Sequence, residues 1–136
     1  MNNKLIIEIH SFSFKKSGIP KDNSGNGGGF VFDCRALPNP GRFDEYRTFT
    51  GLDRPVIDFL KNEAAVGSFL ENVIKIIDQT VENYLQRGFS HLMVNFGCTG
   101  GQHRSVYSAE FTKSHLESTF PVQVILEHDM ANFWNR

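Results

Sequence analysis

Residues 95–105 constrain the fold of this chain most, because they place a strand, a glycine-rich loop and the start of a helix in immediate succession. The alternation of Leu92, Val94 and Phe96 predicts a strand, and the pattern after the loop predicts a helix over residues 104–118. A loop between two such elements directs backbone N–H groups and the positive end of the helix dipole at one point. The sequence therefore predicts a phosphate-binding loop at a strand-to-helix turn, with no need for a metal ion.

Two functions compete for this loop. Cys98 and Arg104 have five residues between them and Ser105 follows, which is the spacing used by cysteine-dependent phosphatases. In that reading Cys98 attacks phosphorus while Arg104 and the loop amides hold the transferred group. A loop that only binds an anion needs no more than the glycines, His103 and Arg104. The spacing alone leaves both functions open.

Other residues weaken the phosphatase interpretation. Such enzymes usually carry a histidine immediately before the cysteine, and Gly97 stands at that position. They also need an aspartic acid that protonates the leaving group, for which Asp33 and Asp129 are the candidates. Cys98 can equally be a small buried hydrophobic residue at a strand end. We therefore favour recognition over catalysis, assign no catalytic residue, and keep Cys98 with Arg104 as the catalytic alternative.

The rest of the chain predicts a single α/β domain over residues 1–136, with a small mixed or mostly parallel sheet flanked by helices. Residues 15–29 are rich in glycine and poor in apolar side chains, which predicts a flexible loop. Strands are predicted at 4–14, 30–34 (buried), 91–96 and 122–126, and helices at 53–62, 66–87 (ended by Gly88) and 104–118. The last two strands and the helix between them form a parallel βαβ unit.

In open α/β sheets, ligands bind beyond the carboxyl ends of the strands, where the segment at Asp33–Arg35 and the loop both lie. Arg35 is either a ligand-binding residue or a surface ion-pair partner. The candidate ligand-binding residues offer a guanidinium, an imidazole, hydroxyls, a thiol or an open amide: Cys98, Thr99, Gly100, Gly101, His103, Arg104, Ser105 and Arg35. We expect no metal ligand and no cofactor. His10, His91 and His115 are interpreted as ordinary packed or surface histidines.

Composition narrows the partners and the compartment. The formal net charge of −1 gives no overall basic excess for nucleic acid. Two cysteines, Cys34 and Cys98, fit a reducing compartment better than a disulfide framework. No apolar run approaches the roughly 20 residues of a membrane span, so we expect a cytoplasmic protein without membrane contact.

Four segments follow one another along the chain: Ser11-Phe-Ser-Phe-Lys15 with Gly18-Ile-Pro20, Val31-Phe-Asp-Cys-Arg35 with Leu37-Pro-Asn-Pro40, Thr50-Gly-Leu-Asp53 with Pro55-Val56, and the loop segment 96–110. In these segments, and in their order, the chain resembles the carboxy-terminal domain of the RapZ (RNase adapter protein) family. The resemblance covers residues 9–118. The P-loop motif of the family's other domain does not occur here, so the resemblance does not imply nucleotide hydrolysis.

The resemblance implies a ligand and a regulatory role. Domains of this family bind glucosamine-6-phosphate, an amino sugar phosphate, through residues that match Thr99, Gly100, Gly101, His103 and Arg104. A further ligand-binding histidine of the family corresponds to the position of Lys16. The resemblance thus predicts a sensor or adapter for a phosphorylated sugar or other small anion, and the candidate ligand-binding set includes Lys16.

Family members also bind a regulatory RNA and self-associate. The resemblance therefore implies an RNA-binding regulatory module as an alternative function, a homo-oligomer, and a separate nucleotide-binding protein as a candidate partner. The basic carboxy-terminal cluster that serves RNA binding in the family is absent from residues 128–136, which predicts weak RNA binding. The basic side chains left for an RNA surface lie in predicted loops: Lys15, Lys16, Lys21, Arg35, Arg42, Arg47 and Arg54.

Overall fold

The computed structural model describes residues 4–136 and contains a four-stranded sheet in the order β2-β3-β1-β4. All neighbouring strands pair in parallel, so the sheet is parallel throughout rather than mixed. The strands are β1 (Ile6–Ser13), β2 (Phe30–Asp33), β3 (His91–Cys98) and β4 (Gln123–His128). The predicted α/β class and the four predicted strands are confirmed, with β3 running two residues further than expected.

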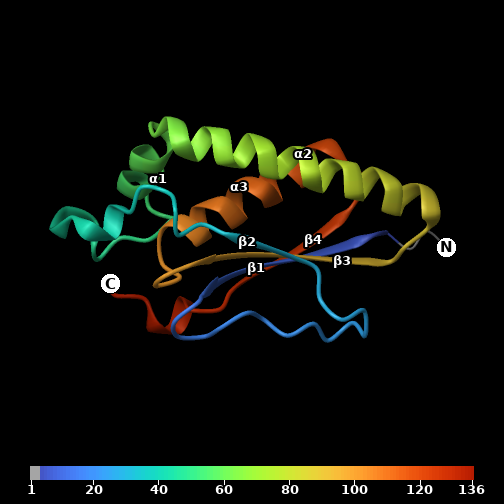
Figure 1. The fold of residues 1–136 in the computed structure, drawn as a ribbon, viewed down its shortest axis with the longest axis horizontal. Helices are drawn as coiled ribbons and strands as arrows, with labels where there is room; N and C mark the ends of the chain where they lie inside the picture. The colour runs from blue at the N-terminus through green and yellow to red at the C-terminus, as the bar shows by residue number, and fades with distance from the viewer. Residues whose placement is uncertain (1–3) are drawn as a thin grey trace.

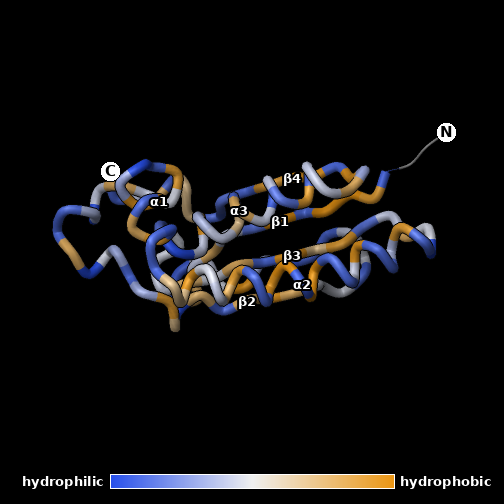
Figure 2. The backbone as a smooth tube through the Cα atoms, turned by 90° about the horizontal axis from the view of Figure 1, so that it is seen from above, coloured by the Kyte–Doolittle hydropathy of each residue, from blue (hydrophilic) through white to orange (hydrophobic). Residues whose placement is uncertain are grey.

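Three helices cover one face of this sheet (Figure 1). They are α1 (Arg54–Lys61), α2 (Ala64–Arg87) and α3 (Arg104–Thr119), and Gly88 ends α2 as predicted. Seen from above, α2 runs on the side of β2 and β3, and α3 on the side of β1 and β4 (Figure 2). Short 3-10 helices lie at Pro40–Arg42, Asp44–Tyr46 and Ala131–Phe133. Of these, the one at Pro40–Arg42 has Pro40 in its first turn and follows Asn39, whose side chain accepts a hydrogen bond from the N–H of Gly41.

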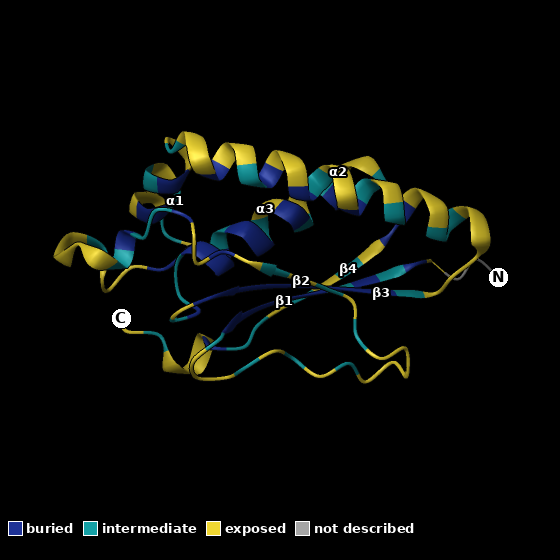
Figure 3. Cartoon of the chain, viewed as in Figure 1, coloured by how far each residue is buried: buried dark blue, intermediate teal, exposed yellow. Residues whose placement is uncertain are grey.

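The core lies between the sheet and the helices, and the two central strands β1 and β3 are its most buried part (Figure 3). The apolar stripe of α2 enters this core through Leu70, Val73 and Ile77. The prediction that residues 30–34 form a buried strand is wrong, because β2 is an edge strand and Val31 is 41% exposed. A short apolar run does not distinguish a central strand from an edge strand.

The βαβ unit of β3, α3 and β4 is parallel, but β1 lies between its two strands. This register places the carboxyl ends of β1 and β3 beside each other, with Ser13 opposite Cys98. The loop 15–29 contains neither helix nor strand, and Asp22 accepts hydrogen bonds from the backbone of Ser24 and Gly28 within it. The loop and the C-terminal segment run below the sheet in Figure 1, on the face opposite the helices.

Among residues 4–136, none of the helices combines the length and the apolar character that crossing a membrane requires.

Candidate functional site

The loop between β3 and α3 lies where the sequence predicted it, at the carboxyl edge of the sheet. α3 begins at Arg104, has no acidic residue in its first turn, and receives no side-chain cap from His103 at its N-cap position. The first N–H groups of a helix have no partner within the helix and carry the positive end of its dipole. The N-terminus of α3 is therefore a ready site for an anion.

Arg104 lies at the centre of this site. Its side chain is 5% exposed, and Nη1 donates hydrogen bonds to the carbonyls of Arg35 at 2.8 Å and Leu37 at 3.1 Å. Its Nε is buried and has no hydrogen-bond partner among residues 4–136. A buried donor left unpaired costs about 1–3 kcal/mol. Arg104 also lines the neighbouring cavity, so an anion bound there is the candidate partner for this donor. Arg104 thus both fixes the segment after β2 and presents an unsatisfied positive charge.

A cavity of about 230 Å³ opens in front of the loop. Six of the predicted residues line it: Lys16, Cys98, Thr99, Gly100, His103 and Arg104. Five further residues complete its wall: Asn39, Gly41, Gln102, Phe133 and Asn135. The structure therefore brings together most of the residues that sequence reasoning selected, and adds a wall from the C-terminal segment.

His103 contributes to the cavity differently from what the sequence suggested. Its Nε2 lies 3.0 Å from the carbonyl of Tyr46, which can only accept, so Nε2 carries the proton. Burial lowers the pKa of His103, and the charge of Arg104 acts in the same direction. The imidazole is therefore neutral at pH 7, and its one donor is used to hold the backbone of residue 46.

The thiol of Cys98 is turned into the loop. Its Sγ accepts a hydrogen bond from the N–H of Gly101 at 3.3 Å and donates to Oγ of Ser105 at 3.1 Å. Cys98 is 2% exposed, and Gly101 and Ser105 are buried behind it, outside the cavity wall. The amide of Gly101 and the hydroxyl of Ser105 thus stabilise the loop. The sequence analysis expected both groups to bind the ligand, but they do not line the cavity.

Two glycines explain why the loop has this sequence. A Cβ on Gly97 would lie 2.4 Å from Cζ of Phe12 and 2.6 Å from Cε2 of Phe14, so no side chain fits before Cys98. Gly101 has a φ of +69°, and a Cβ there would lie 2.7 Å from Cγ of Met130. The departure from the phosphatase pattern at Gly97 is therefore dictated by the packing of β1 against β3.

Arg35 does not reach this cavity. Its guanidinium forms two hydrogen bonds with Asp33, at 2.9 and 2.7 Å, and lies 3.9 Å over the ring of Phe14. The hydrogen bonds from Arg35 hold the pKa of Asp33 below its ordinary value. Asp33 is therefore ionised at neutral pH. Arg35 lies outside the wall of the loop cavity and pairs with Asp33, which corresponds to the ion-pair alternative that the sequence left open for it.

Gln102 organises the site, although sequence reasoning did not select it. Its Nε2 donates to the carbonyls of Arg47, Phe49 and Asn135, and its Oε1 accepts from the N–H of Asn135. Trp134 adds a hydrogen bond from Nε1 to the carbonyl of Gly101 at 2.8 Å. The C-terminal segment is thus attached to the loop by contacts between residues 33 positions apart. No local sequence pattern predicts contacts over this separation.

Larger cavities are also present in residues 4–136. One of about 330 Å³ shares Lys16 and Phe133 with the loop cavity, and two others have no lysine or arginine in their walls. One of about 410 Å³ lies between the loop 26–29 and residues 84–93, and one of about 430 Å³ lies along the outer side of α2 near Gln79 and Gln86. Positive charge and free amides, rather than size, therefore identify the loop cavity as the candidate anion site.

The fold and the loop match a known family. The family model described as the RapZ C-terminal domain matches residues 5–131, nearly the whole chain. The chain belongs to the RapZ C-terminal domain family. The resemblance inferred from the loop and from the segments at residues 11–20, 31–40 and 50–56 is thereby confirmed.

Several curated relatives share this RapZ C-terminal domain, and each is named a nucleotide-binding protein. The relative from Aromatoleum aromaticum is 41% identical over 127 residues, which is 93% of this chain and 41% of that protein. The relative from Acinetobacter baylyi is 36% identical over 134 residues, or 98% of this chain and 44% of that protein. The chain thus spans about two-fifths of the length of these relatives.

A second cluster of titratable side chains lies apart from the cavity loop. His10 Nδ1 is 2.7 Å from Asp129 Oδ1, and His10 Nε2 is 2.6 Å from Glu8 Oε2. Burial alone would lower the pKa of His10, but the hydrogen bonds to Asp129 and Glu8 outweigh it and raise the pKa to about 9. His10 is thus packed in a strand, as the sequence suggested, but it has two carboxylate partners that the sequence analysis did not identify. The sequence contained one sign of this cluster. Titratable side chains stand two positions apart at residues 8 and 10 and again at residues 127 and 129, so in a strand each pair points to one face.

Proposed function

We propose that this RapZ C-terminal domain binds the phosphate group of a small metabolite in the loop cavity, and that the metabolite is an amino sugar phosphate such as glucosamine-6-phosphate. The observation that carries the proposal is the buried, unpaired Nε of Arg104 beside the uncapped N-terminus of α3. The cavity, at about 230 Å³, is smaller than the roughly 300–1,000 Å³ of drug-sized sites, which suits a single sugar phosphate.

Two arguments favour binding over phosphatase chemistry. The thiol of Cys98 donates to Ser105 and is buried, so the protonated form has a defined role in the loop. Asp33 is held ionised by Arg35, and Asp129 is hydrogen-bonded to His10, so neither is free to protonate a leaving group. A sensor or adapter role follows for a site that binds its ligand without converting it.

RNA binding is less favoured by the charges. Arg35, Arg47 and Arg54 each lie within 4.0 Å of a carboxylate, from Asp33, Asp44 and Asp58. These neighbours reduce the net positive charge that a phosphate backbone would meet. As part of the same proposal we place the protein in the cytoplasm, as a homo-oligomer that works with a separate nucleotide-binding partner.

Isothermal titration with glucosamine-6-phosphate tests the proposal, with glucosamine and inorganic phosphate as comparison ligands. Lys16 lines the cavity and is exposed, so Lys16→Ala should weaken binding about 3- to 10-fold without unfolding the protein. Lys15→Ala is the matched control, because Lys15 is equally exposed and does not line the cavity.

The expected pattern is binding of glucosamine-6-phosphate, weaker binding of inorganic phosphate, no binding of glucosamine, and an effect of Lys16→Ala alone. Binding of glucosamine as tight as that of its phosphate, or equal effects of the two lysine variants, would overturn the assignment of the cavity. Turnover of p-nitrophenyl phosphate that disappears in Cys98→Ser would replace binding by phosphatase chemistry.

A further inference from the structure

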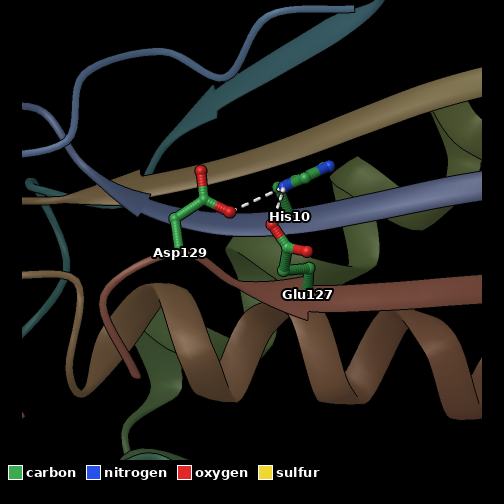
Figure 4. Close-up of side chains that lie close together, drawn as sticks. All are labelled: His10, Glu127 and Asp129. Carbon is green, nitrogen blue, oxygen red and sulfur yellow. Dashed lines mark hydrogen bonds and ion pairs between the residues drawn. The ribbon is translucent and has the colours of Figure 1, made fainter. Parts of the chain in front are cut away.

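A histidine and two carboxylates meet on the sheet face opposite the helices (Figure 4). Ser11 and His128 face the helices, since His128 bonds to Ser11 at 2.6 Å and to Glu110 of α3 at 2.7 Å. Successive side chains of a strand point to opposite faces, so His10 and Glu127 point away from α3. This group, formed by His10, Glu127 and Asp129, is called the His10 cluster below.

Two neighbouring strands fix the His10 cluster. His10 and Glu127 are directly paired in the register of β1 and β4. Asp129 follows β4, and its backbone N–H donates to the carbonyl of Ser11 at 2.9 Å, which continues the ladder by one step. The three side chains therefore start from a rigid part of the sheet, and their relative positions do not depend on a mobile loop.

The donor atoms are close enough to bind one ion. His10 Nδ1 lies 2.7 Å from Asp129 Oδ1 and 3.9 Å from Glu127 Oε2, and the three donor atoms all lie within 4.8 Å of one another. Two ligands of a zinc ion, each at about 2.1 Å, can be at most about 4.2 Å apart, so small side-chain rotations suffice. One nitrogen and two oxygens also match the donor types of divalent transition-metal sites.

His10 Nε2, the ring nitrogen that points away from Asp129, has a hydrogen-bond partner of the kind found at metal-binding histidines. Glu8 Oε2 lies 2.6 Å from His10 Nε2, and Glu8 Oε1 lies 3.1 Å from His91 Nε2. A carboxylate can only accept, so Nε2 keeps its proton toward Glu8. By the same rule Nδ1 donates to Asp129 in the metal-free protein, and an ion bound at Nδ1 takes the place of that proton. Metal-ligating histidines nearly always donate their other N–H to such a partner, which fixes the ring and increases its basicity.

The charges around His10 also favour a cation. Three carboxylates face it, from Glu8, Glu127 and Asp129, and none of them forms an ion pair with a lysine or arginine among residues 4–136. The side chains of His10 and Asp129 are 10% and 17% exposed, whereas that of Glu127 is 70% exposed. An ion would therefore be held mostly inside the protein and be accessible from the side of Glu127.

Asp129 connects the His10 cluster to a second cavity. It borders a cavity of about 330 Å³ together with Lys16, Ser17, Met130 and Phe133. Lys16 and Phe133 also line the loop cavity, so the two cavities adjoin. Three protein ligands leave coordination positions for water or for an anion in this cavity.

We propose that His10, Glu127 and Asp129 bind one divalent transition-metal ion, with Glu8 as the positioning residue that orients His10. The imidazole favours Zn²⁺ over Mg²⁺, which prefers ligand sets of oxygen alone. The site is distinct from the phosphate site proposed above, because none of its three ligands lines the loop cavity.

Titration of the metal-free protein with Zn²⁺, followed by calorimetry, tests this proposal. We expect one equivalent to bind, and Glu127→Gln to weaken binding at least about tenfold. Glu127 is exposed and lies 3.9 Å from His10, so this variant leaves the fold intact even where Asp129→Asn does not. Glu8→Gln should weaken binding about 10–100-fold, as expected of a residue that orients a ligand. Circular dichroism verifies folding in each variant.

Asp78→Asn is the matched control. Asp78 Oδ1 lies 2.8 Å from Nε2 of His115, which repeats a histidine–aspartate contact without a third ligand, and this variant should bind Zn²⁺ like the wild type. Co²⁺ replaces Zn²⁺ in a second titration, and its absorption reports the ligands. A sulfur-to-cobalt charge-transfer band would assign the ion to a cysteine, Cys34 or Cys98, and overturn the proposal, as would no binding at about 1 mM or an unchanged affinity in Glu127→Gln. In the last two cases the His10 cluster is an ion-paired network only.

Discussion

The loop cavity and the His10 cluster lie on the same sheet and have opposite character. The loop cavity has one continuous segment at its centre, Cys98 to Arg104, with further wall residues from three other segments, and it presents a guanidinium and backbone N–H groups. The His10 cluster is built from residues 119 positions apart and presents carboxylates around an imidazole. The first depends on local sequence and the second on strand order, so the two differ in how far a sequence can reveal them.

The largest effect is expected where the loop is packed most tightly. Gly97→His would restore the residue that phosphatases carry before the cysteine, but its Cβ would overlap the rings of Phe12 and Phe14. We expect the free energy of unfolding to fall by more than about 3 kcal/mol, measured by urea denaturation, because β1 and β3 cannot separate without breaking their ladder. Gly100→Ala is the control, since no atom lies within 4 Å of its added Cβ. A stable Gly97→His protein would show that the loop can adopt the phosphatase sequence.

Arg104→Lys should have the next largest effect and concerns the loop cavity alone. Lysine retains the charge but has one nitrogen on a shorter side chain in place of the planar guanidinium, so the hydrogen bonds to the Arg35 and Leu37 carbonyls should weaken, at a cost of about 1–3 kcal/mol for a bond that is lost. Affinity for the sugar phosphate should fall about tenfold, since the fork geometry is lost. Calorimetry with Zn²⁺ should be unaffected, because Arg104 is not one of the three ligands and the structure gives it no hydrogen bond or ion pair with them.

Arg35→Lys is the comparison for that variant. Arg35 is half-exposed and its guanidinium pairs with Asp33, so the free energy of unfolding should change by no more than about 1 kcal/mol and sugar phosphate affinity should stay the same. A loss of affinity equal to that in Arg104→Lys would return Arg35 to the binding site, as the sequence analysis had allowed.

The two cysteines offer a third, smaller difference. Cys98 borders the loop cavity, whereas Cys34 is fully buried, and burial raises the pKa of its thiol to about 12. We expect iodoacetamide to modify Cys98 at least about tenfold faster than Cys34 in the folded protein, and a bound anion to slow the reaction at Cys98. Mass spectrometry of Cys34→Ser and Cys98→Ser variants measures each rate. Equal rates would mean that Cys98 is closed off from the cavity.

Local sequence patterns predicted the position of the loop cavity but not the hydrogen bonds inside it. The strand, loop and helix at residues 91–119 were predicted because their hydrophobic periods and glycines are local, and six of the nine predicted ligand-binding residues line one cavity. The roles of His103 and Gly101 were not predicted, since they depend on the carbonyl of Tyr46 and on the sulfur of Cys98. Hydrogen-bond partners of this kind are set by the folded backbone rather than by residue type.

The order of the strands in the sheet was the second feature that the sequence did not predict. A period of two residues showed that Glu8 and His10 share a strand face, but pairing with Glu127 required knowledge that β4 adds to the free edge of β1 rather than to β3. The same gap explains the edge position of β2 and the attachment of Asn135 to Gln102. Strand order is decided by the packing of helices over the whole sheet, and one sequence carries little direct information about it.

The smallest expected effect is a pH dependence at the loop cavity. Burial lowers the pKa of His103, so folding favours its neutral form, with Arg104 as the nearest charge. The stability gained in this way is fully present above the unfolded pKa of about 6.5 and is lost as the pH falls through the lowered folded pKa. The free energy of unfolding should therefore fall more steeply from about pH 7 to about pH 5 in the wild type than in His103→Asn, in which no group titrates at this position.

His115→Asn, which removes a histidine on another part of α3 that is paired with Asp78, is the control for general acid effects. Parallel curves for the wild type and His103→Asn would mean that the imidazole is solvated, and that the cavity wall at residue 103 is looser than the hydrogen bond to Tyr46 implies.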